Sequence, residues 1–280
     1  MLSGGLAYLT STRGEEWETY LRKFSGFNPL TCCGTTLEGH NVVVRIVRIG
    51  NEGAQHLEIL RKLARGSTGL LTENHIAPLW QEVYFQDLTF VVTPWIGHSL
   101  FECYGFWAKN SVGDLVDIVL QTFQALCFIH DNNIAHRDAH RNNYRVQWFP
   151  ESLTTKRVPI CRPRVFLTDF EMAVEFSTDV PPEQCLLTGL PGRDYKRPVP
   201  PEVVSGQPYD PFKVDVWQLA ESFSDFRSTI PEFDETLAHI VRTDSSMRPT
   251  VIEARDRLAG ILQSIPPIEL LIPPVILKKN

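Results

Sequence analysis

The first third of the chain alternates short β-branched runs with turn residues. This pattern predicts two antiparallel hairpins, whose returning strands are expected at 41–49 and 88–93. Between the two hairpins, leucines recur at helical spacing, which predicts an amphipathic helix over 54–64. A further short helix is expected at 12–24. The N-terminal part should therefore be a small sheet crossed by a helix.

From residue 114 onward, the spacing of apolar residues is mainly helical. A long amphipathic helix is predicted at 114–129, and further helices are predicted around 217–220, 237–241 and 251–262. A mainly β segment followed by a mainly helical segment predicts an α+β protein with two lobes.

The expected boundaries follow this change in pattern. We expect the small N-terminal lobe at about 1–94, a hinge at about 94–98 and the larger C-terminal lobe at about 99–262. The Pro-rich tail, 263–280, is apolar but interrupted by prolines. We expect this tail to form a strap on the surface of the domain, because it contains no apolar run long enough to cross a bilayer.

Composition narrows the class of protein. The chain has 280 residues, of which 43% are hydrophobic and 21% charged, so it can bury a sizeable core. Its net charge of −6 argues against nucleic acid or an anionic membrane as the main partner. The six cysteines form no C-x-x-C pair and no signal peptide is recognisable, so we expect an intracellular protein, cytoplasmic or nuclear.

Three polar residues stand out as candidate chemistry. Asp138 lies five residues before Asn143, directly after the predicted long helix, and Asp169 follows the apolar run 165–167. These residues belong to a series of six motifs whose order and spacing resemble those of the eukaryotic protein kinase family over 35–262. The motifs are His136-Arg137-Asp138, Asn143, Asp169-Phe170-Glu171, Pro200-Pro201-Glu202, Asp215-Val216-Trp217 and Met247-Arg248-Pro249-Thr250.

The resemblance implies ATP and Mg²⁺ as cofactors and a specific division of roles. Asp138 would accept the proton of the substrate hydroxyl, while Asn143 and Asp169 would hold Mg²⁺ on the ATP phosphates. Carboxylates held close together are destabilising unless a cation neutralises them, so the retention of all three residues favours bound Mg²⁺. The residues implied to be structural are His136, Arg137, Glu202, Asp215 and Arg248, with Arg248 pairing with Glu202 and Asp215 hydrogen-bonding the catalytic-loop backbone.

The resemblance also implies nucleotide contacts in the N-terminal lobe. Val92 would line the adenine pocket, and the backbone from Thr93 to Trp95 would hydrogen-bond the base. Arg45 is expected at the position of the family's phosphate-clamping lysine. Arginine keeps the positive charge but presents a larger, planar group.

Several supporting residues depart from the family pattern. His56 occupies the position of the helix glutamate that would pair with Arg45, and Glu58 and Glu52 are alternatives. No G-x-G-x-x-G loop is recognisable, and Glu171 replaces the glycine that usually follows Asp-Phe. His140 replaces the lysine of the catalytic loop and would stabilise the transferred phosphoryl group less well.

These retained and altered positions leave three functions open. The first is a divergent kinase acting on a protein substrate, on serine or threonine by default, with Thr188 and Tyr195 as phosphosites that Arg137 would contact. The second is a pseudokinase, a binding or scaffold module with little or no turnover. The third is a small-molecule phosphotransferase of the choline- or aminoglycoside-kinase type, which Glu171 favours and the Pro-Pro-Glu motif opposes.

Overall fold

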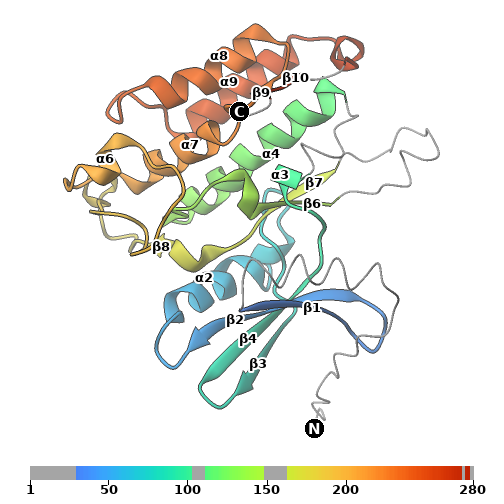
Figure 1. Ribbon diagram of the computed structural model, residues 1–280, viewed down its shortest axis with the longest axis vertical. Coiled ribbons are helices and arrows are strands. Elements are labelled where there is room, and N and C mark those ends of the chain that lie inside the picture. Colours follow the sequence, from blue (N-terminus) through green and yellow to red (C-terminus); the bar gives the residue numbers. More distant parts are fainter. Residues whose placement is uncertain (1–29, 103–110, 148–162, 273–274, 278–280) are drawn as a thin grey trace. The chain divides into compact units, whose positions relative to one another are not determined.

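The computed structural model describes residues 30–102, 111–147, 163–272 and 275–277 (Figure 1). The expected helix at 12–24 therefore lies outside the described residues. The chain divides into two compact units, each described by itself below. The N-terminal unit comprises Met1–Leu71 and Ala77–Ile96, and the C-terminal unit comprises Thr72–Ile76 and Gly97–Asn280.

The N-terminal unit contains a four-stranded antiparallel sheet with strand order β1-β2-β4-β3 (Figure 1). Both predicted hairpins are present, because β1 pairs with β2 and β3 pairs with β4. The returning strand of each hairpin closely follows the predicted range. The strands are β1 (Thr31–Thr35), β2 (Asn41–Ile49), β3 (Gln81–Phe85) and β4 (Leu88–Pro94).

Helix α2 (Ala54–Ala64) has the predicted bounds and packs against β2. Its buried face includes Leu57 and Leu63, as the helical spacing predicts. The helix is preceded by Gly53 at a φ of 80°, where a Cβ atom would lie 2.0 Å from the Val47 carbonyl oxygen. Only glycine fits this close approach, which fixes how α2 follows the sheet.

The C-terminal unit is built around α4, which packs against α7 and α9, while α8 packs against α7 and α9. By length and composition alone α4 could cross a membrane, but 72% of its apolar window is buried inside the structure, which accounts for its composition. The helices are α3 (Leu100–Glu102), α4 (Val112–Asp131), α6 (Pro201–Val204), α7 (Pro211–Glu221), α8 (Pro231–Arg242) and α9 (Val251–Gln263).

The C-terminal unit also contains short strand pairs, and the described pairs are antiparallel. In the pair β6–β7, Tyr144 lies opposite Leu167. Asn143 precedes Tyr144 and Asp169 follows Leu167 by two residues, so both predicted metal ligands reach the same end of this hairpin. The strands are β5 (Ile134–Ala135), β6 (Tyr144–Gln147), β7 (Arg164–Leu167), β8 (Val174–Glu175), β9 (Phe226–Arg227) and β10 (Val275–Ile276).

Two segments from outside the helical core complete the C-terminal unit. The segment Thr72–Ile76 joins β7, since the Leu167 N–H donates to the His75 carbonyl at 2.6 Å. Part of the tail also joins this unit, because β10 pairs with β9 and the Leu277 N–H donates to the Asp225 carbonyl at 2.7 Å.

The described elements form an antiparallel sheet with one main helix in the N-terminal unit and a mostly helical C-terminal unit. The predicted α+β fold class is therefore confirmed, and the architecture is consistent with a bilobal, kinase-like fold.

Candidate active site

The loop 136–143, which carries Asp138, is held in shape by α7. The Asp215 side chain is fully buried and accepts hydrogen bonds from the backbone N–H groups of His136 at 2.7 Å and Arg137 at 2.6 Å. His130 Nε2 lies 3.0 Å from the same carboxylate. The contact expected between Asp215 and the loop backbone is thus present, and it satisfies two amides beside the candidate site.

Gln218 of α7 and Ser222, which directly follows α7, extend this support. Gln218 Oε1 accepts a hydrogen bond from the Ala139 N–H at 3.0 Å, and Ser222 Oγ accepts one from the Arg141 N–H at 3.2 Å. The Arg141 guanidinium then forms two hydrogen bonds with Asp225, at 2.5 and 2.6 Å. Sequence reasoning missed these groups, although Asp215, Gln218 and Ser222 follow one another at helical spacing, which places them on one face.

Asn143 and Asp138 contact each other directly. Asn143 Nδ2 donates to the Asp138 carbonyl oxygen at 2.8 Å and to Asp138 Oδ2 at 2.7 Å, and both residues are buried. The amide nitrogen is therefore committed to Asp138, which leaves Asn143 Oδ1 as the acceptor of that side chain. Burial raises the pKa of Asp138, and the nearby Arg197 guanidinium opposes that rise.

Asp169 is positioned by the backbone that precedes it. The Thr168 N–H and hydroxyl donate to the Asn143 carbonyl at 2.8 and 2.9 Å, which ties the start of this segment to Asn143. Asp169 then adopts a φ of 68°, in the left-handed region that residues other than glycine seldom occupy. Such backbone strain is often found where function constrains a residue.

The donor chemistry of Asn143 and Asp169 fits Mg²⁺. An amide oxygen and a carboxylate are hard ligands, and Mg²⁺ commonly takes only one or two protein carboxylates while phosphates and waters complete its octahedron. Within the described residues, no group of three or more His, Cys, Asp or Glu side chains could hold a metal ion. The donor set of Asn143 and Asp169 fits a cation whose remaining ligands come from a bound phosphate and waters.

His136 and Arg137 contact residues that follow β7. His136 is fully buried, with Nε2 3.0 Å from the Thr168 carbonyl oxygen and its ring 5.0 Å from that of Phe170. Arg137 has a φ of 64° and donates a hydrogen bond to the Leu190 carbonyl at 3.3 Å. Both residues therefore link the loop 136–143 to the segment 169–202.

The segment 169–202 also reaches Asp138 itself. The Tyr195 hydroxyl donates to Asp138 Oδ1 at 2.6 Å and accepts a hydrogen bond from Gln218 Nε2 at 3.0 Å. Arg197 Nη1 lies 3.0 Å from Asp138 Oδ2. Sequence analysis predicts Tyr195 only as a phosphosite and does not identify Arg197. Both residues lie more than fifty positions from the loop 136–143, and no local pattern connects them to it.

His140, which was expected to stabilise the transferred phosphoryl group less well than a lysine, lies in a buried position. His140 is only 6% exposed, and burial, assisted by the charge of Arg197, lowers its pKa to about 4. It is therefore neutral at physiological pH and does not supply the positive charge of the lysine it replaces. Its ring instead hydrogen-bonds the Pro198 carbonyl.

The far end of the segment 169–202 is fixed by the expected ion pair. Arg248 Nη1 lies 2.6 Å from Glu202 Oε1, and the Arg248 side chain is only 2% exposed. Arg248 Nη1 also donates to the Lys213 carbonyl at 3.1 Å, at the start of α7. The pair thus connects the short helix α6 to the helix that supports the loop 136–143.

In the N-terminal unit, one backbone N–H of the segment predicted to bind the nucleotide donates within the sheet. The Trp95 N–H, expected to hydrogen-bond adenine, donates to the Asn41 carbonyl at 3.0 Å. The reason is that β4 continues through Pro94, which pairs with Val42 of β2, so the next amide completes the sheet. Pro94 itself has no N–H to offer.

The other predicted residues of the N-terminal unit lie on the sheet and on α2. Arg45 is on β2 opposite Val91, and Val92 is partly buried on the adjacent strand β4. Glu58 is exposed and pairs with Arg61 at 2.6 Å, which argues against Glu58 as the partner of Arg45. His56 is buried on α2.

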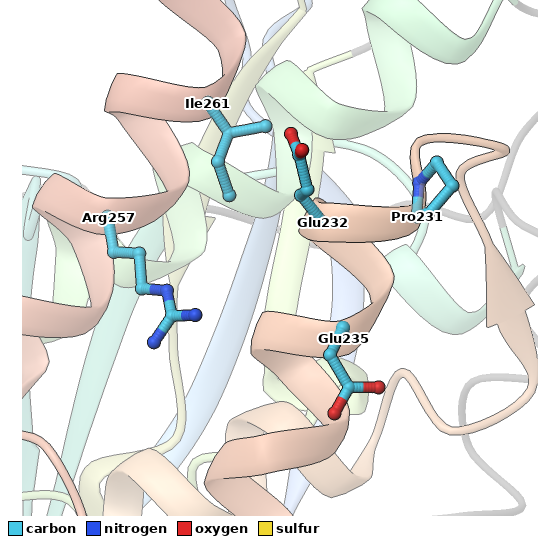
Figure 2. Close-up of a pocket in the computed structure, with 5 residues that line it drawn as sticks. All are labelled: Pro231, Glu232, Glu235, Arg257 and Ile261. Carbon is cyan, nitrogen blue, oxygen red and sulfur yellow. The ribbon is translucent and has the colours of Figure 1, made fainter.

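A separate surface depression lies between α8 and α9 (Figure 2). Glu232 and Glu235 contribute from α8, and Arg257 and Ile261 contribute from α9. The charged side chains around it are exposed, and none of its lining residues is a predicted site residue. We assign it no role in the candidate active site.

Comparison with known proteins supports a distant relationship to kinases. No protein-family model matches the chain. An Aurora kinase from Yarrowia lipolytica (strain CLIB 122 / E 150) is 24% identical over 200 residues, which cover 69% of this chain and 48% of that protein. The match thus spans about half the length of the curated relative. With the site geometry above, this similarity supports a protein-kinase-like relationship.

Proposed function

We propose that the protein is a divergent protein kinase, which transfers a phosphoryl group from ATP to a protein hydroxyl with the help of Mg²⁺. The observation that carries this proposal is the contact between Asn143 and Asp138, together with the bonds from Thr168 to the Asn143 carbonyl. These contacts bring the proposed proton acceptor and the segments of both proposed metal ligands to one place.

The acceptor count of Asp138 leaves a position for a substrate hydroxyl. Its two carboxylate oxygens offer about four acceptor positions. Tyr195 occupies one position on Oδ1, while Asn143 and Arg197 face Oδ2. One acceptor position on Oδ1 is then left, and there Asp138 would orient the hydroxyl and take its proton. When bound, Mg²⁺ would be held by Asn143 Oδ1 and Asp169 and would offset phosphate charge.

The end of the segment 169–202 favours a protein as the substrate. The buried pair of Arg248 with Glu202 fixes this segment against α7, and the Tyr195 contact fixes it against Asp138. A segment held at both points would form a surface beside the proposed proton acceptor, which suits a peptide more than a small alcohol.

A specific set of observations favours the pseudokinase as the second candidate. The Trp95 N–H is used within the sheet and His140 is neutral, so two expected contacts to ATP are altered. In that case the same fold would act as a binding or scaffold module with little or no turnover.

Calorimetric titration with Mg-ATP is the first test, because the kinase proposal requires nucleotide binding. The wild type should bind Mg-ATP in a magnesium-dependent manner, and Asp169→Asn should abolish that dependence because one metal ligand loses its charge. Asp179→Asn is the matched control, since Asp179 is exposed in the same segment. Absence of binding by the wild type at millimolar nucleotide would reject the kinase proposal. Nucleotide binding followed by phosphate incorporation into a protein acceptor would support it over the pseudokinase.

A further inference from the structure

Among the described residues, no basic side chain of the loop 136–143 forms an ion pair with Asp138. His140 stands at the position of the loop lysine and is only 6% exposed. The arginines of the loop are committed elsewhere, since Arg137 donates to the Leu190 carbonyl and Arg141 is bound to Asp225. Phosphoryl transfer relies on fixed positive groups around the phosphate. Any such group on the protein must therefore come from another segment.

Arg197 lies where that charge is required. Its Nη1 atom is 3.0 Å from Asp138 Oδ2, and its Nη2 atom is 3.5 Å from Asn143 Oδ1. The Nη1 atom is buried, yet it has no aligned hydrogen-bond acceptor among the residues that the structure describes. Because the ion pair leaves this donor without a well-directed acceptor, Nη1 can donate to an anionic oxygen placed beside Asp138 and Asn143.

The neighbours of Arg197 hold it in this position from both sides. Two residues before it, Tyr195 is fixed between Asp138 and Gln218. Directly after it, the Pro198 carbonyl is hydrogen-bonded by His140, the residue that replaces the loop lysine. The same substitution that removes a charge from the loop therefore anchors the backbone that brings Arg197 to Asp138.

We propose that Arg197 supplies, from the segment 169–202, the cation that contacts the transferred phosphate in place of the lysine missing from the loop. This inference rests on the proposed function, because it names the ligand as the terminal phosphate of ATP. The planar guanidinium offers several N–H donors that match the oxygens of a phosphate.

The test compares the affinities of full-length variants for Mg-ATP and Mg-ADP by calorimetry. Only ATP carries the phosphate that Arg197 would contact. Arg197→Gln should weaken ATP binding by about tenfold or more, while ADP binding changes by less than about twofold, because one charge-assisted contact is lost. Arg197→Lys should retain most of the ATP affinity, since the charge stays. Lys196→Gln is the matched control, because Lys196 is the exposed neighbour with the same charge.

The outcomes distinguish this inference from the proposed function. If the wild type binds neither nucleotide, the proposed function fails and Arg197 has no phosphate to contact. If the wild type binds ATP but Arg197→Gln weakens both nucleotides equally, or neither, the role of Arg197 is rejected while the proposed function stands. An equal loss for both nucleotides with a lower melting temperature would indicate a structural role. A loss confined to ATP, recovered by Arg197→Lys, would support the proposal.

Discussion

The predicted site residues of the two units differ in the contacts that they make. In the C-terminal unit, Asp215 and Asn143 each bind groups of the loop 136–143, so they complete the fold as well as the site. In the N-terminal unit, the Trp95 amide is used by the sheet, and Arg45 stands where a lysine is expected. Residues whose side chains also satisfy buried backbone groups are costly to change, because the lost hydrogen bonds leave unpaired polar atoms.

The same contrast appears in the ion pairs of the two units. Arg61 pairs with Glu82 at 2.6 Å on the N-terminal unit, where the arginine side chain is 34% exposed. Arg248 in the C-terminal unit is almost fully buried against Glu202. Removing Arg61 leaves Glu82 with Arg65 as a partner, whereas removing Arg248 leaves the Glu202 carboxylate without its ion-pair partner. Substitutions should therefore have larger effects in the C-terminal unit.

The largest expected effect is that of Arg248→Met. This change removes the partner of the Glu202 carboxylate and the donor to the Lys213 carbonyl. It should lower the free energy of unfolding by about 3–5 kcal/mol. Urea denaturation measures this loss. The control is Arg242→Met, whose exposed partner is Glu235, and it should cost less than about 1 kcal/mol. Equal losses for the two variants would contradict the contrast.

The second effect is a dependence of stability on pH through His140. Its pKa is about 4 in the folded protein and 6.5 as the ordinary value, so the unfolded chain binds more protons between these limits. Stability should therefore fall as the pH drops from 6.5 towards 4. In His140→Gln, the loss of unfolding free energy between pH 7.5 and 4.5 should be smaller than in the wild type by about 2–3 kcal/mol.

Urea denaturation at both pH values checks this expectation. Burial also lowers the pKa of His75, but this residue is present in both proteins and cancels in the comparison. The same pH dependence in the wild type and in His140→Gln would show that His140 is not held neutral.

The third effect concerns the link between α7, the loop 136–143 and Tyr195. Gln218→Leu removes the acceptor of the Ala139 N–H and a donor to the Tyr195 hydroxyl. It should lower the free energy of unfolding by about 1–3 kcal/mol, because the remaining groups are buried and unpaired. Hydrogen exchange should accelerate at the Ala139 amide. The exposed Gln207→Leu provides the control, and matching exchange rates in both variants would argue against this link.

The smallest effect is expected in the N-terminal unit. Arg45→Lys keeps the positive charge on β2, so it should change the affinity for Mg-ATP by less than about tenfold, with little change in stability. Calorimetry and urea denaturation measure the two quantities. A large gain in phosphoryl transfer would mean that Arg45 limits the activity, and the N-terminal unit would then matter more to function than the contrast between the units implies.

The sequence by itself determined the local elements and the spacing of the central polar residues. The bounds of α2 and the returning strands of both hairpins follow from hydrophobic periodicity, because burial of one face imposes a regular pattern along a single element. The short distance from Asp138 to Asn143 was also visible, since five residues within one loop can bring the two side chains into contact.

Only the tertiary structure decided which distant groups reach this site. Arg197 and Tyr195 come to Asp138 because the segment 169–202 folds back over the loop, and His140 loses its charge because that segment buries it. The Trp95 amide is used because β4 extends further along β2 than the sequence indicated. Such contacts depend on how elements pack against one another. Periodicity within one element does not identify the element that will pack against it.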